Sequence, residues 1–386
     1  MVILNFLMSV HDIFYALPFS VYGLIEKLQP FFSKDIVFFM DTIQPHTELI
    51  DAYSLFEKAV EKGVNSYYLM SKKHPSYKEI KKKYKNKILE FDRNELHLKQ
   101  FFKFLRLKKF INSFGFGGNL RLFLYKNKYI DLVHLNHGVT LLKNSIFDLY
   151  NYKEFNKFLV SNDTEAKLMI DYGGFKEENL VKSTMPHFDL LNENKTQSDE
   201  KSILMFFTWR MSFANVDYKK SLYYQNMKSL LENQEFNKIL NENNIKLKLA
   251  LHHTLIEKGT NFVLDNADFA NSTQLSKEIK NAKMLITDYS SVWADFYFQN
   301  KPVIFYRLDN EDPVLNERDN QNSRFASKWD NILTNVVYDE QKVLEIVKKY
   351  IECDFQTDDR EKQIQDKFFY VKENVREKIL ESEGLI

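Results

Sequence analysis

A strand, a turn, a helix and a second strand follow one another between Met284 and Asp309, and this unit restricts the fold more than any other stretch of the sequence. Four apolar residues lead into a polar turn that ends in Asp288-Tyr289-Ser290-Ser291, and Lys301-Pro302 then starts the second strand. Such a turn places hydroxyl groups and unpaired backbone N–H groups at a helix N-terminus, where the partial positive charge favours phosphate. Ser and Asp are also ordinary N-cap residues, so helix capping is the simpler interpretation of the turn taken alone.

The same alternation of strands and helices extends over most of the sequence. Apolar runs predict strands at residues 36–40, 66–70, 88–91, 131–136, 158–161, 203–207 and 247–251. Apolar spacings of three and four predict helices at residues 48–62, 94–110, 275–282, 341–351 and 363–379, and several helical segments between about 219 and 241. Alternating strands and helices indicate an α/β fold whose parallel sheets are covered on both faces.

With 386 residues, the chain is long enough for two domains, because single cores usually stop growing at roughly 250 to 300 residues. The polar run from Asn192 to Lys201 reads as a linker. We therefore divide the chain into an apolar segment 1–34, a first domain 35–190, a linker 191–200, a second domain 201–360 and a closing helix 361–386.

The first 34 residues are rich in Phe, Leu and Val, yet they match neither a signal peptide nor a membrane-spanning helix. They lack a basic start and a small-residue cleavage site. His11, Asp12 and Pro18 interrupt the apolar run before it reaches the roughly 20 residues that a spanning helix needs. We expect short helices, which either pack on the core or lie on a membrane surface.

Charge is distributed unevenly along the chain. Residues 1–190 carry 27 Lys and Arg against 21 Asp and Glu, a net +6, whereas the rest carries 27 against 32, a net −5. Basic residues between Lys72 and Lys109 alternate with aromatic ones, which suits an anionic membrane surface or a phosphorylated acceptor as well as a solvated helix face. The pI of 7.7 argues against a nucleic-acid partner.

Cysteine usage points to a reducing compartment. Cys353 is the single cysteine, so the chain forms no internal disulfide, and no Cys/His spacing indicates zinc. We expect a cytoplasmic protein.

Short polar motifs follow several of the predicted strands. They are HGVT (137–140), TWR (208–210), HHT (252–254), TDYSS (287–291) and YRLD (306–309). The carboxyl ends of parallel strands form the edge at which open α/β sheets bind their ligands. His137 taken alone is more often a structural residue than a catalytic one. The glycine-rich FGFGGN (114–119) lacks the GxGxxG spacing of a phosphate loop and is interpreted as a turn.

Five motifs follow one another along the chain: HGVT, TWR, LALHH (249–253), LITDYSSVWADF (285–296) and KPVIFY (301–306). In their order and spacing, these motifs resemble the CDP-glycerol glycerophosphotransferase family. The similarity runs from about residue 35 to FFYVKENVREKIL near the C-terminus. It implies a GT-B fold, in which two Rossmann-like domains face a central cleft and the second domain binds the donor nucleotide. It also implies transfer of a polyol phosphate such as glycerol phosphate, with release of CMP, in the synthesis of teichoic acid or capsule polymers.

Some positions differ from the usual family pattern. This chain has HGVT where the family commonly has HGTP, and it has Phe207 where a proline usually precedes TWR. It has His252-His253 where HP is common, and Pro186-His187-Phe188-Asp189 where PRFD is common. These differences leave the transferred polyol and the acceptor open.

The resemblance assigns a role to each candidate residue. His137 is the expected general base, because the attacking hydroxyl must lose a proton to a group with a near-neutral pKa. His252 is the second expected catalytic residue, and it faces the donor diphosphate together with Arg210. The remaining donor-side candidates are Thr208, His253, Asp288, Ser290 and Ser291, of which Asp288 fixes the turn or contacts the donor. The acceptor-side candidates are Gly138, Thr140 and His187.

The expected partners are a CDP-linked donor and a lipid-linked or polymeric acceptor at the inner face of the cell membrane. We expect no protein-bound metal and no tightly bound cofactor, while Mg²⁺ carried by the donor stays open. The alternatives are a GT-B glycosyltransferase that uses a nucleotide sugar for capsule or lipooligosaccharide synthesis, and a non-catalytic polymer-binding scaffold with a degenerate cleft. Intact histidines and an intact DYSS motif argue against the scaffold.

Overall fold

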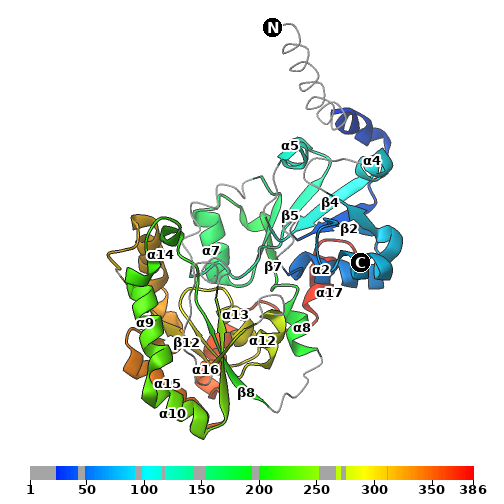
Figure 1. The fold of residues 1–386 in the computed structure, drawn as a ribbon. Helices are drawn as coiled ribbons and strands as arrows, with labels where there is room; N and C mark the ends of the chain where they lie inside the picture. Colours follow the sequence, from blue (N-terminus) through cyan, green and yellow to red (C-terminus); the bar gives the residue numbers. More distant parts are fainter. Residues whose placement is uncertain are drawn as a thin grey trace, which may run out of the picture.

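The computed structural model shows two parallel sheets, each flanked by helices (Figure 1). It describes residues 23–41, 48–91, 98–114, 118–142, 154–193, 200–251, 267–270, 275–310 and 312–386. Below, the elements of the first sheet form the N-terminal domain and those of the second sheet form the C-terminal domain.

The N-terminal sheet has seven strands in the order β3-β2-β1-β4-β5-β6-β7, all parallel. Its strands are β1 (Ile36–Met40), β2 (Ser66–Met70), β3 (Ile88–Glu90), β4 (Leu107–Asn112), β5 (Asp131–His134), β6 (Lys157–Val160) and β7 (Leu180–Lys182). The accompanying helices are α2 (Asp51–Glu61), α3 (Tyr77–Tyr84), α4 (Leu98–Leu105), α5 (Gly118–Lys126), α7 (Asp163–Asp171) and α8 (Phe188–Asn192). The strand order reverses between β1 and β4, as in doubly wound dinucleotide-binding folds.

The C-terminal sheet has six parallel strands in the order β10-β9-β8-β11-β12-β13. Its strands are β8 (Lys201–Phe206), β9 (Ile245–Ala250), β10 (Ala267–Phe269), β11 (Met284–Thr287), β12 (Val303–Tyr306) and β13 (Val336–Val337). Its helices are α9 (Leu222–Glu232), α10 (Gln234–Glu242), α12 (Leu275–Asn281), α13 (Trp293–Phe298), α14 (Glu317–Ser327) and α15 (Glu340–Glu352). The reversal falls between β8 and β11, so the turns after these two strands lie at the position where such sheets bind ligands.

Strands β1, β11 and β12 consist almost entirely of apolar residues because helices cover both faces of their sheets. All four residues of β11 and all four of β12 are buried. In β11, Ile286 lies opposite Met205 of β8 on one side and Ile304 of β12 on the other. This packing gives the turn after β11 a rigid base.

Two further helices, α16 (Asp359–Asp366) and α17 (Val375–Ser382), carry the chain back to the N-terminal domain. Helix α17 lies beside α2 in Figure 1 and forms an ion pair from Glu377 to Lys62. Beyond α17, the buried carboxylate of Glu383 pairs with Lys109 of β4 and lies 3.2 Å from the amine of Lys157. The end of the chain is therefore tied to the first sheet.

The structure confirms most of the predicted strands and corrects two of the predicted helices. The helix expected over 94–110 ends at Leu105, and β4 begins at Leu107. The helix expected over 363–379 is two helices, separated by a segment in which Asn374 adopts a left-handed conformation with φ 53°. Gly118, the fifth residue of the FGFGGN piece, begins α5, while residues 115–117 lie outside the described residues.

Candidate functional site

Two turns, one from each domain, are in contact at the carboxyl edges of the two sheets. The first follows β5 and contains His137 and Gly138, and the second follows β11 and contains Ser290 and Ser291. Gly138 has φ 149°, and a Cβ atom built on it would lie 2.5 Å from Ser291 Oγ and 2.7 Å from Ser291 Cβ. Only glycine permits so close an approach, so the motifs predicted to face each other are indeed neighbours.

The turn that carries His137 is held by its own side chains. Asn136 adopts a left-handed conformation with φ 66°, its Oδ1 accepts from the His137 amide at 2.9 Å, and its Nδ2 donates to Thr140 Oγ1 at 2.5 Å. The His137 side chain is exposed, and its ring stacks on Phe114 with centroids 4.7 Å apart. The geometry thus presents an imidazole to solvent on a fixed backbone.

Glu165 of α7 supports this turn from beneath. Its carboxylate is buried and accepts from the amides of Thr140 at 2.8 Å and Ser161 at 2.7 Å. Burial raises the pKa of Glu165, although these amide contacts oppose the rise. The amide of Thr140 thus donates to α7 and its hydroxyl accepts from Asn136, and both contacts hold Thr140 in the turn.

Asp288 organises the turn of the C-terminal domain. Its carboxylate is fully buried and accepts from the amides of Thr208 at 2.9 and 3.1 Å and of Tyr289 at 2.6 Å. These contacts join the turn after β8 to the turn after β11, as expected for a residue that fixes the turn. Thr208 Oγ1 is buried and has no hydrogen-bond partner among the described residues.

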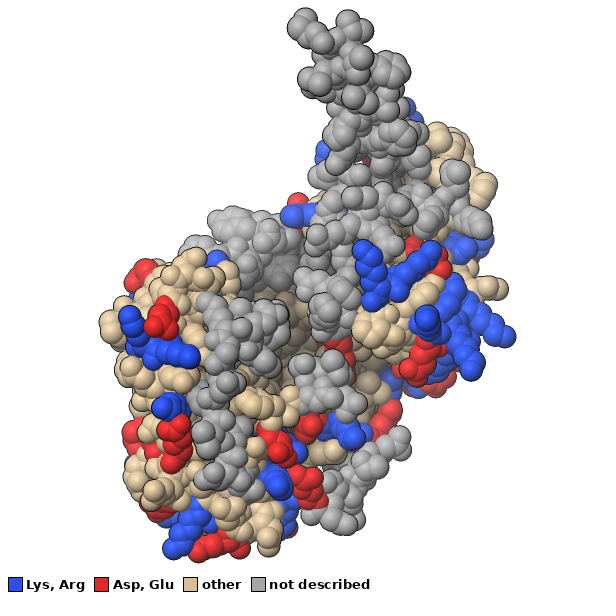
Figure 2. All heavy atoms as spheres, in the orientation of Figure 1, with Lys and Arg blue, Asp and Glu red and all other residues tan. Residues whose placement is uncertain are grey.

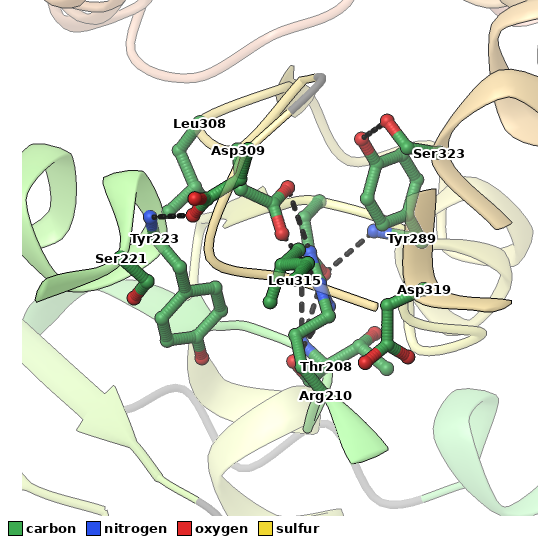
Figure 3. A network of polar contacts seen from close by, with 12 residues as sticks. Thr208, Arg210, Ser221, Tyr223, Tyr289, Leu308, Asp309, Leu315, Asp319 and Ser323 are labelled. Atoms are coloured by element: carbon green, nitrogen blue, oxygen red, sulfur yellow. Dashed lines mark hydrogen bonds and ion pairs between the residues drawn. The ribbon is translucent and has the colours of Figure 1, made fainter. Parts of the chain in front are cut away.

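Arg210 lies within a buried network of charges (Figure 3). Its guanidinium donates to both carboxylate oxygens of Asp309, at 2.6 and 2.9 Å, and to Asp288 at 2.7 Å. It also donates to the carbonyl of Thr208 at 2.7 Å. The sequence suggested that Arg210 faces the donor diphosphate, whereas the structure places its charge between two carboxylates at the base of the turn.

Tyr289 lies between two arginines, Arg210 and Arg307. The sequence did not indicate that these three residues contact one another. The guanidinium carbons of Arg210 and Arg307 lie 4.9 and 4.7 Å from the centre of its ring. Arg307 also donates to the backbone carbonyl of Asp288 and pairs with Asp330. The motif YRLD, which follows β12, contains two of the anchoring residues, Arg307 and Asp309, and its position at the strand end was the available signal.

Ser290 and Ser291 follow the anchored residues and precede α13. Ser290 is almost fully buried, and its Oγ accepts weakly from the Val292 amide at 3.4 Å. Neither serine is the N-cap, since that position belongs to Val292 and carries no side-chain hydrogen bond. Within the described part of the chain, no acceptor takes a hydrogen bond from the backbone amides of Ser290 and Ser291.

His187 lies between the two domains rather than at an open acceptor surface. Its Nδ1 is 2.6 Å from Asp51 of α2, its Nε2 is 2.9 Å from Asp295 of α13, and 13% of the side chain is exposed. Burial alone would lower the pKa of His187, but Asp51 and Asp295 outweigh burial and raise it to about 10.

His252 and His253 lie outside the described residues, so their predicted roles stay predictions. No group of three or more His, Cys, Asp or Glu side chains that suits a metal ion occurs in the described ranges. Nor does any helix in those ranges have the length and apolar character needed to cross a membrane.

The chain is similar in sequence to known proteins over most of its length. Residues 24–382 match the family model of CDP-glycerol:poly(glycerophosphate) glycerophosphotransferase. The minor teichoic acid biosynthesis protein GgaB of Bacillus subtilis is 25% identical over 287 residues, which are 67% of this chain and 30% of GgaB. The teichoic acid glycerol-phosphate primase of Bacillus subtilis is 22% identical over 75% of this chain and 81% of the primase. The chain therefore spans less than a third of the length of GgaB but most of the length of the primase.

Solved structures share the fold. A structure of the wall teichoic acid polymerase TagF superposes with a TM-score of 0.66 at 14% identity, over 98% of this chain and 95% of that one. A UDP-N-acetylglucosamine 2-epimerase from Listeria monocytogenes superposes with a TM-score of 0.57 at 11% identity, over 90% and 95% of the two chains. The architecture is thus GT-B-like, with two parallel α/β domains, as the sequence predicted. Since the family model covers nearly the whole sequence, this chain belongs to the CDP-glycerol:poly(glycerophosphate) glycerophosphotransferase family.

Proposed function

We propose that this protein transfers a polyol phosphate from a CDP-activated donor to a hydroxyl group of a cell-surface polymer or a lipid-linked acceptor, with release of CMP. The observation that carries the proposal is the contact between Gly138 and Ser291, which places an exposed histidine beside a turn rich in hydrogen-bond donors. The relatives support the class of substrate, because GgaB, the ribitol-phosphate polymerase TarL of Staphylococcus aureus and the glycerol-phosphate primase are all named for teichoic acid synthesis.

In the proposed reaction, His137 is the general base. The acceptor oxygen attacks the phosphorus that bears the polyol, the bond from this phosphorus to the oxygen bridging to CMP breaks, and the acceptor proton passes to the imidazole. An exposed ring, stacked on Phe114 and fixed through its backbone by Asn136, suits this role because it is held in position while remaining accessible to substrate.

On the donor side, the turn after β11 is proposed to hold the diphosphate. The amides of Ser290 and Ser291, which donate to no described residue, and the hydroxyl of Thr208 supply donors to the negative charge that develops on the leaving CMP. Arg210 and Asp288 position these donors rather than contact the diphosphate, because their charges are already paired. His252 and His253, from the segment after β9, would complete the donor site.

The substrate class is tested with a panel of donors. Purified protein should release CMP from CDP-glycerol, CDP-ribitol or a related CDP-polyol when a teichoic acid or membrane extract is supplied as acceptor, and should release no UDP from UDP-sugars. CMP formed without acceptor reports hydrolysis only, so each donor is assayed with and without the extract. Turnover of UDP-sugars in preference to CDP-polyols would instead identify a GT-B glycosyltransferase.

We also propose that the N-terminal domain meets the inner face of the cell membrane. Leu24, Phe31 and Phe102 are large apolar side chains that are 49%, 82% and 67% exposed. Figure 2 shows Lys and Arg atoms gathered on one side of this domain, and the exposed lysines of α3 and the turn after it include Lys82 and Lys85. Exposed apolar side chains can enter a lipid surface, and cations on the same domain attract anionic lipid.

Binding to vesicles tests this surface. The protein should sediment with vesicles that contain phosphatidylglycerol and less so with phosphatidylcholine alone, because each lysine near an anionic surface contributes about 1 kcal/mol. Replacing Lys82 and Lys85 by glutamine should then weaken sedimentation by roughly tenfold or more. The matched control replaces Lys228 and Lys238, exposed lysines of the C-terminal domain, and should bind as the wild type does. Equal losses in both variants would refute a localised surface.

A further inference from the structure

One histidine side chain joins the two domains at a point separate from the contact between Gly138 and Ser291. His187 immediately precedes α8, and its ring lies between Asp51, the first residue of α2, and Asp295, in α13. Helix α2 belongs to the N-terminal domain and α13 to the C-terminal domain. A single imidazole thus contacts one carboxylate from each domain.

The geometry identifies the form of the ring that makes both contacts. A neutral imidazole has one N–H group, so it can donate to only one carboxylate, whereas the imidazolium donates from both nitrogens. Distances of 2.6 Å to Asp51 and 2.9 Å to Asp295 are those of hydrogen bonds at both ends of the ring. His187 is consequently a cation shared between two anions, and loss of its proton breaks one of the two links.

This link acts on the same short segment that carries the proposed donor site. Asp295 follows Ser291 by four residues, and Ser291 in turn contacts Gly138. Holding Asp295 against Asp51 therefore holds the turn after β11 against the turn after β5. Two separate contacts, one polar and one steric, then define the distance between the His137 ring and the turn of Ser290 and Ser291.

We propose that His187 is a positioning residue that, by bridging Asp51 and Asp295, keeps the two domains in the arrangement in which His137 faces the donor turn. The catalytic consequence rests on the function proposed above, whereas the bridge itself is a property of the fold. The side-chain hydrogen bonds of His187 go to α2 and α13, through which it acts on the two turns.

The bridge predicts a distinctive pH dependence of stability. The ionisable groups that face His187 are Asp51 and Glu48 from the N-terminal domain and Asp295 from the C-terminal domain. The pKa of His187 is about 10 in the folded chain against 6.5 for an unperturbed histidine. A raised folded pKa means that the contribution to stability is complete below pH 6.5, declines between pH 6.5 and 10, and is lost above pH 10.

The experiment compares His187→Gln, which is uncharged, with His187→Arg, which is permanently charged and can donate to both carboxylates. In His187→Gln, we expect kcat to fall by about tenfold or more with a change of less than about twofold in the KM of the CDP-polyol, because the donor site lies within one domain while His137 lies in the other. His187→Arg should recover most of the kcat. Amide exchange in α2 and α13 should quicken in His187→Gln and stay slow in His187→Arg.

Controls separate this inference from the proposed function. Lys62→Gln removes an exposed ion pair from the same helix α2 to Glu377 and should change neither exchange in α13 nor turnover. If His187→Gln folds poorly, Asp295→Ala breaks the same bridge from the other side, because alanine has no acceptor for the His187 ring. Unchanged exchange in α13 and an unchanged pH dependence of stability in both variants would overturn the bridge. If the wild type turns over no CDP donor, the proposed function fails, while exchange and pH dependence still decide the role of His187.

Discussion

Replacing Arg210 by leucine is expected to lower the free energy of unfolding of the C-terminal domain by about 3–5 kcal/mol, the usual cost of removing one partner from a buried ion pair. The variant leaves Asp288 and Asp309 buried without the cation that both contact. It also removes one of the two guanidinium groups that lie against Tyr289. The turn that bears Ser290 and Ser291 should therefore loosen together with the domain.

Guanidinium denaturation followed by tryptophan fluorescence measures this effect. All three tryptophans, Trp209, Trp293 and Trp329, belong to the C-terminal domain, so the signal reports on that domain. The control is Arg324→Leu, which removes an ion pair to Glu317 on the surface and should cost at most about 1 kcal/mol. Equal destabilisation by the two substitutions would show that the Arg210 network does not hold the turn.

His137→Ala is expected to reduce turnover by a factor of about 100 or more, which corresponds to roughly 2.7 kcal/mol in activation free energy. The acceptor hydroxyl would lose its proton acceptor, while the donor turn keeps its contacts. Since His137 is exposed, its removal leaves no cavity, and the thermal unfolding midpoint should match that of the wild type. Steady-state CMP release with acceptor present is the measurement.

Binding of CMP separates chemistry from donor recognition in the same variant. Calorimetric titration with CMP should give an affinity close to that of the wild type, because the nucleotide is proposed to bind the other domain. The companion variant His252→Ala should lose turnover by a similar factor of about 100 or more through weaker stabilisation of the leaving group. Near-normal CMP release by His137→Ala would remove this residue from the role of base.

Fold class and strand positions could be predicted from the sequence because buried parallel strands are short apolar runs bounded by polar turns. Strand β4 could not be predicted, because the residues before it keep the apolar spacing of a helix. In addition, a lysine such as Lys109 is expected to be exposed when the sequence alone is considered. Lys109 is buried, and its amine pairs with Glu383, far along the chain, as well as with Asp131. Local patterns contain no information about a partner at such a separation in sequence.

The candidate site, like the fold, could be predicted only in part from the sequence. Polar motifs at strand ends predicted which turns meet, since parallel strands share one carboxyl edge. The ion-pair partner of each charged side chain could not be predicted. From the sequence, Arg210 is a cation without a known partner, and only the structure shows that it pairs with Asp309. His187 likewise reads as an isolated histidine until α2 and α13 bring Asp51 and Asp295 to its two nitrogens.

The pairing of Lys109 with Glu383 also bears on how the chain folds during synthesis. Strand β4 pairs with β1 and β5, so Lys109 lies at the centre of the first sheet. Its amine lies 3.0 Å from Asp131, but the more deeply buried carboxylate, that of Glu383, leaves the ribosome 274 residues later. A buried amine without its full complement of partners destabilises the structure around it. The N-terminal domain therefore reaches its final stability only after the C-terminal domain and residue 383 have been made.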